Sequence, residues 1–114
     1  MATKKEELKV KYSAHIREKF GVEVDVELLE RVVHGLGPAI YNRDAATVSG
    51  SSESELETVK NNFLIKKLGL ENTPSLMVAI TELMNRYGRS ERTKYRAVVY
   101  YMLVKEFGKE DIYN

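Results

Sequence analysis

A triplet of a charged residue, a large apolar residue and glycine occurs four times in this chain and constrains its fold more than any other feature. The apolar residues before each triplet recur at helical spacing. A glycine just past a helix end adopts the left-handed conformation that caps the last carbonyl groups without a Cβ clash. The pattern predicts an all-α fold, a compact bundle of about five helices. The predicted helix ends are Lys19-Phe20-Gly21, Lys67-Leu68-Gly69, Arg86-Tyr87-Gly88 and Glu106-Phe107-Gly108.

Helix start signals precede these stops. Two Ser/Thr-x-x-Glu pairs have the spacing of a capping box, in which each side chain bonds the other residue's backbone amide: Thr3 with Glu6, and Ser52 with Glu55. Asp25 is a typical N-cap, and Thr73 precedes a proline, which favours the first turn of a helix. Together with the apolar stripes, these signals predict helices at about 4–20, 26–36, 53–68 and 74–87, and a last helix that begins near Ser90.

The last predicted helix is apolar on all sides from Ala97 to Val104. Its β-branched and aromatic residues would also suit a buried strand. We predict a helix, because the chain offers no second strand to pair with it and because the stop pattern follows at Gly108. A helix that is apolar all round is normally buried, so this C-terminal helix should be the central one of the bundle.

The composition narrows the classes of function. A chain of 114 residues is expected to form one domain, 1–114. It has no cysteine, which excludes disulfides, zinc–thiolate sites, iron–sulfur clusters and cysteine nucleophiles. His15 and His34 are its two histidines, and no spacing suits a metal, so we expect no metal or cofactor and no catalytic residue is assigned. The N-terminus lacks the apolar segment of a signal peptide, and the longest apolar run is too short to span a membrane. We therefore expect a soluble, cytoplasmic protein with no membrane partner.

Basic residues gather where the last helix is predicted to begin. They are opposed by a single acid, Glu91, in a chain whose net charge is only +1. Arginine matches phosphate groups bidentately, and a helix start attracts anions, so one interpretation is a phosphate or nucleic-acid site. The other is a solvated helix entrance whose charges have no specific role. The candidate anion-binding residues are Arg86, Arg89, Arg92, Lys94 and Arg96.

The least regular stretch runs from Gly37 to Ser52, and polar side chains follow one another within it. With His34 as a general base, they would form a small-ligand or enzymatic site. The alternative is turn chemistry, in which Asn and Asp side chains cap short turns and the tyrosine packs on the core. The candidate residues are His34, Tyr41, Asn42, Arg43 and Asp44.

Apolar residues outside the helix stripes suggest a third function. Tyr100, Tyr101 and Val104 lie on different faces of the last helix, and Val10 and Ile65 lie off their stripes. Any of these left exposed would mark a surface for an unknown protein partner or for self-association. The tail carries Ile112 and Tyr113, which would dock back or bind a partner. We favour a non-enzymatic protein-interaction module, with anion binding and then a ligand site as alternatives.

Two stretches of this chain resemble a known family. One runs from Gly37 to Lys67 and includes Gly-Pro-Ala-Ile-Tyr-Asn-Arg-Asp-Ala-Ala-Thr-Val-Ser-Gly-Ser, and the other joins Lys94-Tyr95-Arg96-Ala97-Val98 to Tyr100-Tyr101. The chain is similar over nearly its whole length to the small bacterial proteins grouped as domain of unknown function 2853. The resemblance implies a bacterial, soluble protein of one domain. It implies no activity, cofactor or catalytic residue, so no site is transferred from it.

Overall fold

The computed structural model describes residues 3–42, 45–88, 91 and 93–113. Its α-helices are α1 (Lys4–Phe20), α2 (Val26–Leu36), α3 (Glu53–Thr58), α4 (Pro74–Tyr87) and α5 (Arg96–Phe107). A π-helix, η2 (Val59–Ile65), continues α3, and two 3₁₀ helices, η1 (Gly37–Tyr41) and η3 (Glu110–Tyr113), follow α2 and α5. The described residues contain no strand, only an isolated bridge between Thr47 and Tyr95, so the predicted all-α fold is confirmed.

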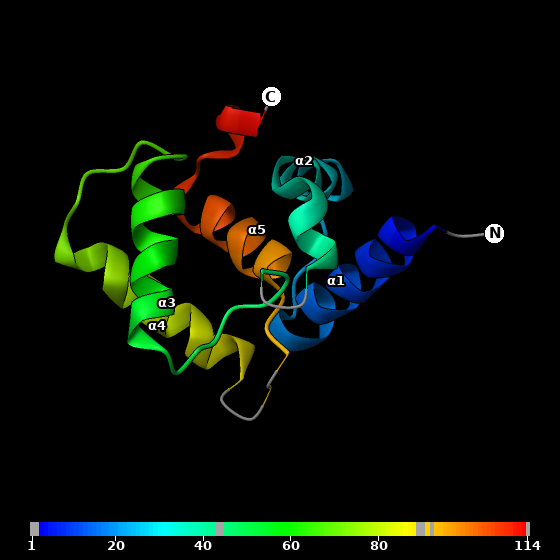
Figure 1. Cartoon of the computed structure of the whole chain (residues 1–114), viewed down its shortest axis with the longest axis horizontal. Helices are drawn as coiled ribbons and strands as arrows, with labels where there is room; N and C mark the ends of the chain where they lie inside the picture. Colours follow the sequence, from blue (N-terminus) through cyan, green and yellow to red (C-terminus); the bar gives the residue numbers. More distant parts are fainter. Residues whose placement is uncertain (1–2, 43–44, 89–90, 92, 114) are drawn as a thin grey trace.

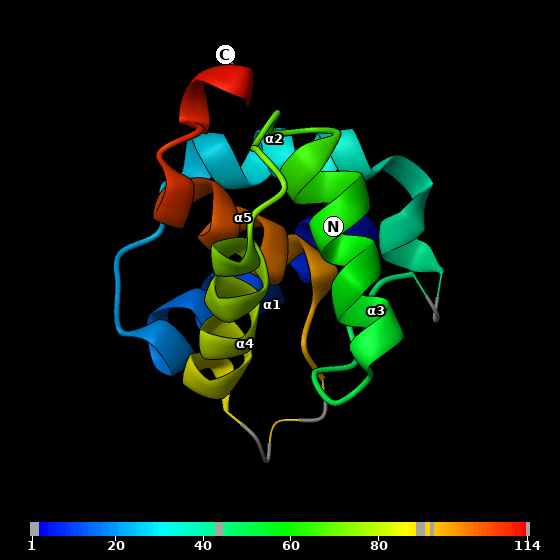
Figure 2. The ribbon, with the colours of Figure 1, turned by 90° about the vertical axis from the view of Figure 1, so that its left-hand side faces the viewer.

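Helix α5 is the central element, as its sequence predicts. Helices α1 and α2 lie on one side of it, and α3 and α4 lie on the other (Figure 1). Seen from the α3–α4 side, α5 runs behind these two helices (Figure 2). Seven of its residues are buried in one apolar cluster with residues from every other α-helix: Ala97, Val98, Val99, Tyr101, Met102, Leu103 and Val104.

The predicted left-handed stop signals are confirmed at Gly21 and Gly108, whereas Gly88, with φ 117° and ψ 121°, has another conformation. All four glycines of the triplets have a positive φ, and Gly21 and Gly108 have the left-handed conformation at the ends of α1 and α5. The capping box of Thr3 and Glu6 is also present, with the Thr3 hydroxyl accepting a bond from the Glu6 amide. Local chemistry therefore sets most of the helix boundaries.

Two predicted helices differ from the structure. The third changes at Val59 from α to π geometry, in which Lys66 donates to the Asn61 carbonyl at 3.2 Å and Leu68 donates to the Phe63 carbonyl at 2.9 Å. The last helix begins at Arg96 rather than near residue 90. The residues before Arg96 are held in an extended conformation by long-range backbone bonds, which no local pattern indicates.

The predicted capping box at Ser52 is only half formed. The Ser52 hydroxyl accepts a bond from the Glu55 amide at 3.4 Å. The Glu55 carboxylate instead pairs with Arg96, at 3.2 Å. Thr73 precedes α4, but its side chain forms no cap, and its hydroxyl bonds that of Ser75 at 2.7 Å. In both cases a side-chain partner outside the cap competes with the backbone amides.

Of the apolar residues outside the predicted stripes, Val10 is left exposed and those on the last helix are covered. Tyr101 and Val104 are buried because α1, α2 and α4 cover α5, and Tyr100 is half-buried against Phe63. Ile65 is likewise partly buried against the core. Large apolar side chains remain exposed on the outer elements: Val10, Val22, Val26, Tyr41, Val78 and Ile112.

Candidate functional site

The irregular segment after η1 is held against the start of α5 by backbone hydrogen bonds. The Val48 amide donates to the Lys94 carbonyl, and the Arg96 amide donates to the Ala46 carbonyl, each at 2.8 Å. These bonds flank the antiparallel bridge between Thr47 and Tyr95. The two short segments, 46–48 and 94–96, therefore lie side by side although about half of the chain separates them.

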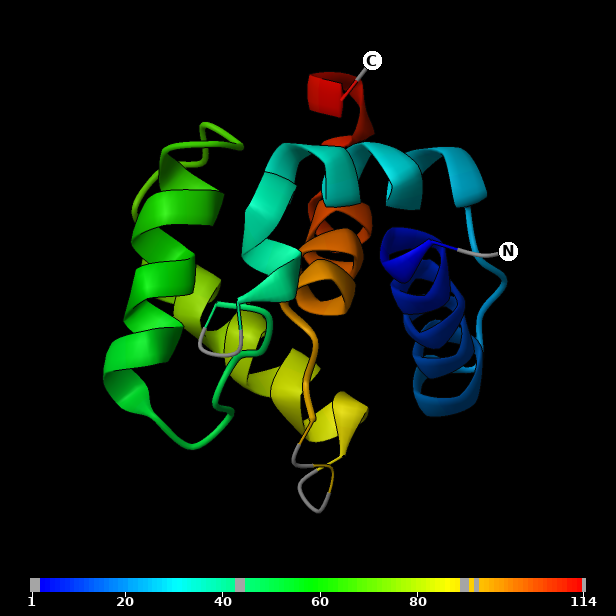
Figure 3. The ribbon, with the colours of Figure 1, turned by 45° about the vertical axis from the view of Figure 1, so that its right-hand side comes forward.

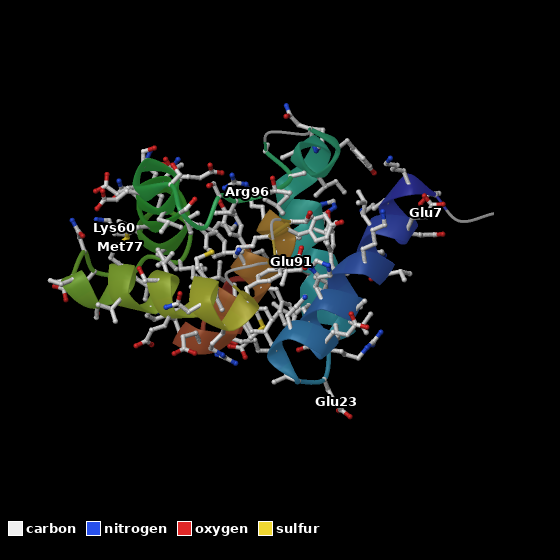
Figure 4. All side chains as sticks on the ribbon, turned by 90° about the horizontal axis from the view of Figure 1, so that it is seen from below. Glu7, Glu23, Lys60, Met77, Glu91 and Arg96 are labelled. Carbon is white, nitrogen blue, oxygen red and sulfur yellow. The ribbon has the colours of Figure 1, made fainter. Side chains whose placement is uncertain are left out.

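The Arg96 side chain completes this connection. Its Nε donates to the Ala45 carbonyl at 2.6 Å, and its Nη2 donates to the Thr47 carbonyl at 3.4 Å and to Glu55 Oε1 at 3.2 Å. The guanidinium lies between the ribbons of α3 and α5 (Figure 4), and the side chain is only 14% exposed. Arg96 thus joins the irregular segment and α3 to the central helix.

An aromatic pair extends the contacts of Arg96 to the π-helix. Its Nη1 donates to the Tyr100 hydroxyl at 3.2 Å, and its Cζ lies 5.7 Å from the centroid of the Tyr100 ring. The Tyr100 ring stacks on Phe63 with centroids 3.8 Å apart and planes 11° from parallel. We name the residues Arg96, Glu55, Tyr100 and Phe63, with the carbonyls of Ala45 and Thr47, the arginine clamp.

Lys94 also turns inward. The residue is buried, and its ammonium group donates to the Glu91 carbonyl. Its stem packs on Gly50 so closely that a Cβ there would lie 3.1 Å from Lys94 Cε. The absence of a side chain at Gly50 thus makes space for the stem of Lys94. Lys94 and Arg96, two of the five predicted anion-binding residues, have their charged groups in interior contacts.

Arg86 is placed differently from these two. It lies exposed in the last turn of α4, with Cζ 5.3 Å from the centroid of the Phe20 ring. It also lines a shallow hollow between α4 and α5, together with Ala79, Glu82, Leu83, Leu103 and Glu106. Arg89 and Arg92 lie outside the described residues. The structure therefore does not gather Arg86, Lys94 and Arg96 on one surface.

The predicted ligand-site residues lie along the end of α2 and η1. His34 is exposed in the last turn of α2, and Tyr41 is exposed at the end of η1. Asn42 forms a turn, in which its side-chain oxygen accepts from the Ala45 amide at 3.3 Å and its carbonyl accepts from the Ala46 amide at 2.7 Å. Arg43 and Asp44 lie outside the described residues. For Asn42 the geometry is that of turn chemistry.

A second polar centre, which the sequence analysis missed, joins α1 to α4 and to the segment before α5. His15 Nδ1 lies 2.5 Å from the Tyr87 hydroxyl, and the Tyr95 amide donates to the same hydroxyl at 3.3 Å. The Tyr95 ring has its centroid 5.0 Å from those of both Tyr12 and His15. We name Tyr12, His15, Tyr87 and Tyr95 the histidine–tyrosine cluster.

The hydrogen bonds of this cluster fit a neutral histidine. Because the Tyr87 hydroxyl accepts from the Tyr95 amide, its own proton is free to point at the unprotonated Nδ1 of His15. Burial lowers the pKa of His15, nearby Glu91 opposes this effect, and Lys19 adds to it. Burial also raises the pKa of the Tyr87 hydroxyl, which keeps it protonated. The pair therefore acts as a neutral structural bond near pH 7.

An ion pair lies next to this cluster. Lys19 Nζ is 3.1 Å from Glu91 Oε2, and the other carboxylate oxygen accepts from the Thr93 amide at 3.1 Å. Both bonds favour the charged carboxylate and hold the pKa of Glu91 below its usual value. Through Glu91, the end of α1 is linked to the segment that precedes α5.

Tyr12 carries a buried hydroxyl that has no hydrogen-bond partner within the described part of the chain. Burial and the nearby hydroxyls of Tyr95 and Tyr41 raise its pKa to about 12. A desolvated polar group without a partner lowers stability. We expect Tyr12→Phe to raise the free energy of unfolding by up to about 1 kcal/mol, as measured by urea denaturation at pH 7.5.

The matched control for this substitution is Tyr101→Phe. The Tyr101 hydroxyl accepts from the Asp25 amide at 2.7 Å at the start of α2, so its removal should cost about 1 kcal/mol. Equal losses in both variants would mean that the Tyr12 hydroxyl has a stabilising partner. We expect changes of opposite sign in the free energy of unfolding, because the Tyr101 hydroxyl has a hydrogen-bond partner and the Tyr12 hydroxyl has none among the described residues.

One sequence signal pointed toward the histidine–tyrosine cluster. His15 follows Tyr12 by three positions, so both lie on the same side of the first helix, at the edge of its apolar stripe. That spacing predicts a histidine facing the core. It does not predict Tyr87, which is 72 positions away, as its partner.

Neither a metal site nor a membrane span is found in the described ranges. No group of three or more His, Asp or Glu side chains there is arranged to hold a metal ion. No helix within residues 3–42, 45–88 or 93–113 has the length and apolar character needed to cross a membrane.

The two stretches that carry the family resemblance meet at the arginine clamp. Arg96 of one stretch donates there to the Thr47 carbonyl and the Glu55 carboxylate of the other. No curated protein matches the chain. The model of a family described as protein of unknown function, DUF2853, matches residues 11–111. The resemblance is thereby confirmed, and the chain belongs to the DUF2853 family.

Proposed function

We propose that this protein is a small non-enzymatic module that binds another protein through its outer helices. The observation that carries this proposal is the division between its polar and apolar side chains. Arg96, Lys94 and His15, which offer the chemistry of a site, make interior contacts. Large apolar side chains instead face solvent, with Val10 on α1 and Val26 on α2 each 68% exposed and Val78 on α4 55% exposed. Covering such exposed apolar groups with a partner makes the free energy of binding more favourable.

Charged substitutions at these positions test the proposal. The tagged chain would be used to isolate a bound protein, and the affinity of the purified pair would then be measured by calorimetry. We expect Val10→Glu or Val78→Glu to weaken binding at least tenfold, because a buried charge replaces an apolar contact. Thr81→Glu is the matched control for α4, since it adds one negative charge at an exposed position, and Lys11→Glu is the control for α1, where it reverses the charge of an exposed lysine. Equal affinity of all four variants would contradict the proposal for these helices.

A second candidate function is binding of phosphate groups or nucleic acid. The observation that favours it is Arg86, which is exposed and forms no ion pair with another described residue. Arg89 and Arg92 follow it closely in the sequence, so we include all three in this candidate site. Lys94 and Arg96 are left out of it, because binding through them would break their interior hydrogen bonds.

Fluorescence anisotropy with short labelled RNA and duplex DNA tests this candidate. Binding through three arginines should weaken steeply between about 50 and 200 mM salt. It should be lost in a chain that carries Arg86→Glu, Arg89→Glu and Arg92→Glu. Arg17→Glu changes the charge of an exposed arginine on α1 and is the control. Binding that survives the triple substitution, or no binding at low salt, would remove the candidate.

A further inference from the structure

The segment after α5 folds back over the bundle. Gly108 ends α5 in the left-handed conformation, and the Lys109 amide donates to the Val104 carbonyl at 3.0 Å. The short helix η3 then lies over α2, which runs beneath it in Figure 3. Of the two alternatives for this tail, docking back or binding a partner, the structure shows it docked on the bundle.

The tail is anchored by one aromatic side chain. Tyr113 is partly buried against the core, and its ring lies over Lys67, with Nζ 5.2 Å from the ring centroid. The bare backbone of Gly35 on α2 faces the ring, since a Cβ there would be 3.6 Å from Tyr113 Cε1. Burial, together with nearby Tyr100, raises the pKa of Tyr113 to about 12. We name Gly35, Lys67 and Tyr100 the tyrosine notch.

Other side chains of the tail face solvent. Ile112 is an exposed residue. Glu110 lies 3.8 Å from Lys105, which also lies 3.5 Å from Asp25, and all of these groups face solvent. Exposed ion pairs of this kind contribute little to stability. The tail is therefore a short element whose Ile112 side chain and Glu110 ion pair with Lys105 face solvent, and elements with few buried apolar contacts open at low free-energy cost.

We propose that the tyrosine notch is a peptide-binding site, which takes an aromatic residue from an acidic segment of a partner protein and which the chain's own tail occupies in its absence. Lys67 supplies a cation for the aromatic face, and Gly35 supplies space for the ring. The occupant present in the structure defines the chemistry, because Glu110 and Asp111 precede the anchoring Tyr113. This inference rests on the proposed function as an interaction module and gives it a specific surface.

Competition between the two occupants sets the affinity. A partner segment binds only to the fraction of molecules whose tail has left the notch, so the cis tail lowers its apparent affinity. The tethered tail acts at a high effective concentration, which a short hinge after Gly108 maintains. Removing the Tyr113 ring while keeping the chain intact should therefore strengthen binding of an external peptide.

The test is a titration of the full chain carrying Tyr113→Ala with a synthetic Lys-Glu-Asp-Ile-Tyr-Asn peptide, followed by amide NMR. At about 1 mM peptide, we expect shifts at Gly35, Lys67 and Tyr100, and binding at least tenfold tighter than to the wild-type chain. Lys67→Glu, combined with Tyr113→Ala, should weaken binding about tenfold. A peptide with alanine in place of its tyrosine is the control and should cause no shift at the notch.

Several outcomes would overturn the inference: no shifts at the notch, equal shifts with the alanine peptide, or equal affinity for the wild-type chain. If Tyr113→Ala does not fold, the wild-type chain gives the answer. Its amides at 110–113 should move to random-coil positions as excess peptide replaces the tail, and unchanged positions would overturn the inference. Failure of the notch together with loss of a partner in Val10→Glu or Val78→Glu would leave the proposed function intact, so the two proposals fail separately.

Discussion

Replacement of Arg96 by methionine is expected to lower the free energy of unfolding by about 3 kcal/mol. Methionine keeps much of the apolar stem but removes every donor of the guanidinium. The carbonyls of Ala45 and Thr47 and the carboxylate of Glu55 then lose their shared partner in a mostly covered site. A buried acceptor that has lost its donor cannot bond water instead, so its desolvation penalty is not offset. This loss of stability therefore exceeds that of an ordinary surface pair.

Urea denaturation followed by circular dichroism measures this loss. Arg96→Lys is the informative second variant, because it keeps the charge but lacks the planar fork that reaches three acceptors, and we expect a loss of about 2 kcal/mol. Arg31→Met is the matched control, since Arg31 pairs with Glu27 one turn away on the exposed face of α2, and we expect it to cost about 0.5 kcal/mol. A loss for Arg96→Met no greater than for Arg31→Met would contradict the role of the arginine clamp.

Much of the fold was predictable from the sequence because helix ends are chosen by nearby residues. The Thr3 hydroxyl and the Asp25 carboxylate each accept a bond from an amide in the first turn of their own helix. Gly21 and Gly108 have left-handed conformations immediately after the last helical residue. Each of these signals acts over a few positions, so it is visible in a single sequence.

The start of α5 was predicted wrongly because its cause is not local. The segment around Lys94 is extended since it pairs with the segment around Val48, and that pairing requires a folded chain. The arginine clamp has the same character: Arg96 is 51 positions from Ala45 and 41 from Glu55. The sequence marked Arg96 as one of several cations, and nothing in its neighbourhood separated an interior cation from an exposed one.

The family resemblance and the packing meet at the same place. The stretch that begins at Gly37 and the stretch around Tyr95 are distinctive as sequences, and in the structure they form the bridge and the arginine clamp. Thr47, Glu55 and Arg96 in these stretches thus have a structural role in the fold. A search for function in this protein should begin at its surface, at Val10, Val78 and the tyrosine notch.

Replacement of Tyr87 by phenylalanine is expected to cost about 2 kcal/mol. The phenol bonds both His15 Nδ1 and the Tyr95 amide, at 2.5 and 3.3 Å, so one substitution removes the partners of two groups. The ring itself is kept, which preserves its edge contact with Phe20 at a centroid distance of 5.2 Å. Urea denaturation at pH 7.5 gives the loss, and a loss below that of Tyr101→Phe would contradict a bridging role for this hydroxyl.

The same cluster should make stability depend on pH. The folded protein lowers the pKa of His15 below 6.5, so the unfolded chain binds the proton more readily. The stability that comes from neutral His15 is thus fully present above about pH 6.5 and is lost as the pH falls toward the folded pKa. Protonation also places a hydrogen on Nδ1, where the Tyr87 proton now lies, so the bond must reverse its direction.

His15→Gln separates this contribution from the others. Between pH 7.5 and 5.5 we expect the wild-type chain to lose stability relative to His15→Gln, while His34→Gln, at the exposed histidine, should follow the wild type. Glu30 and Glu91 do not interfere, because hydrogen bonds to their carboxylates lower both pKa values, away from this range. The donor to Glu30 is Lys9, and the donors to Glu91 are the Thr93 amide and Lys19. If the free energy of unfolding changed with pH in the same way for wild type and His15→Gln, the folded state would not favour neutral His15.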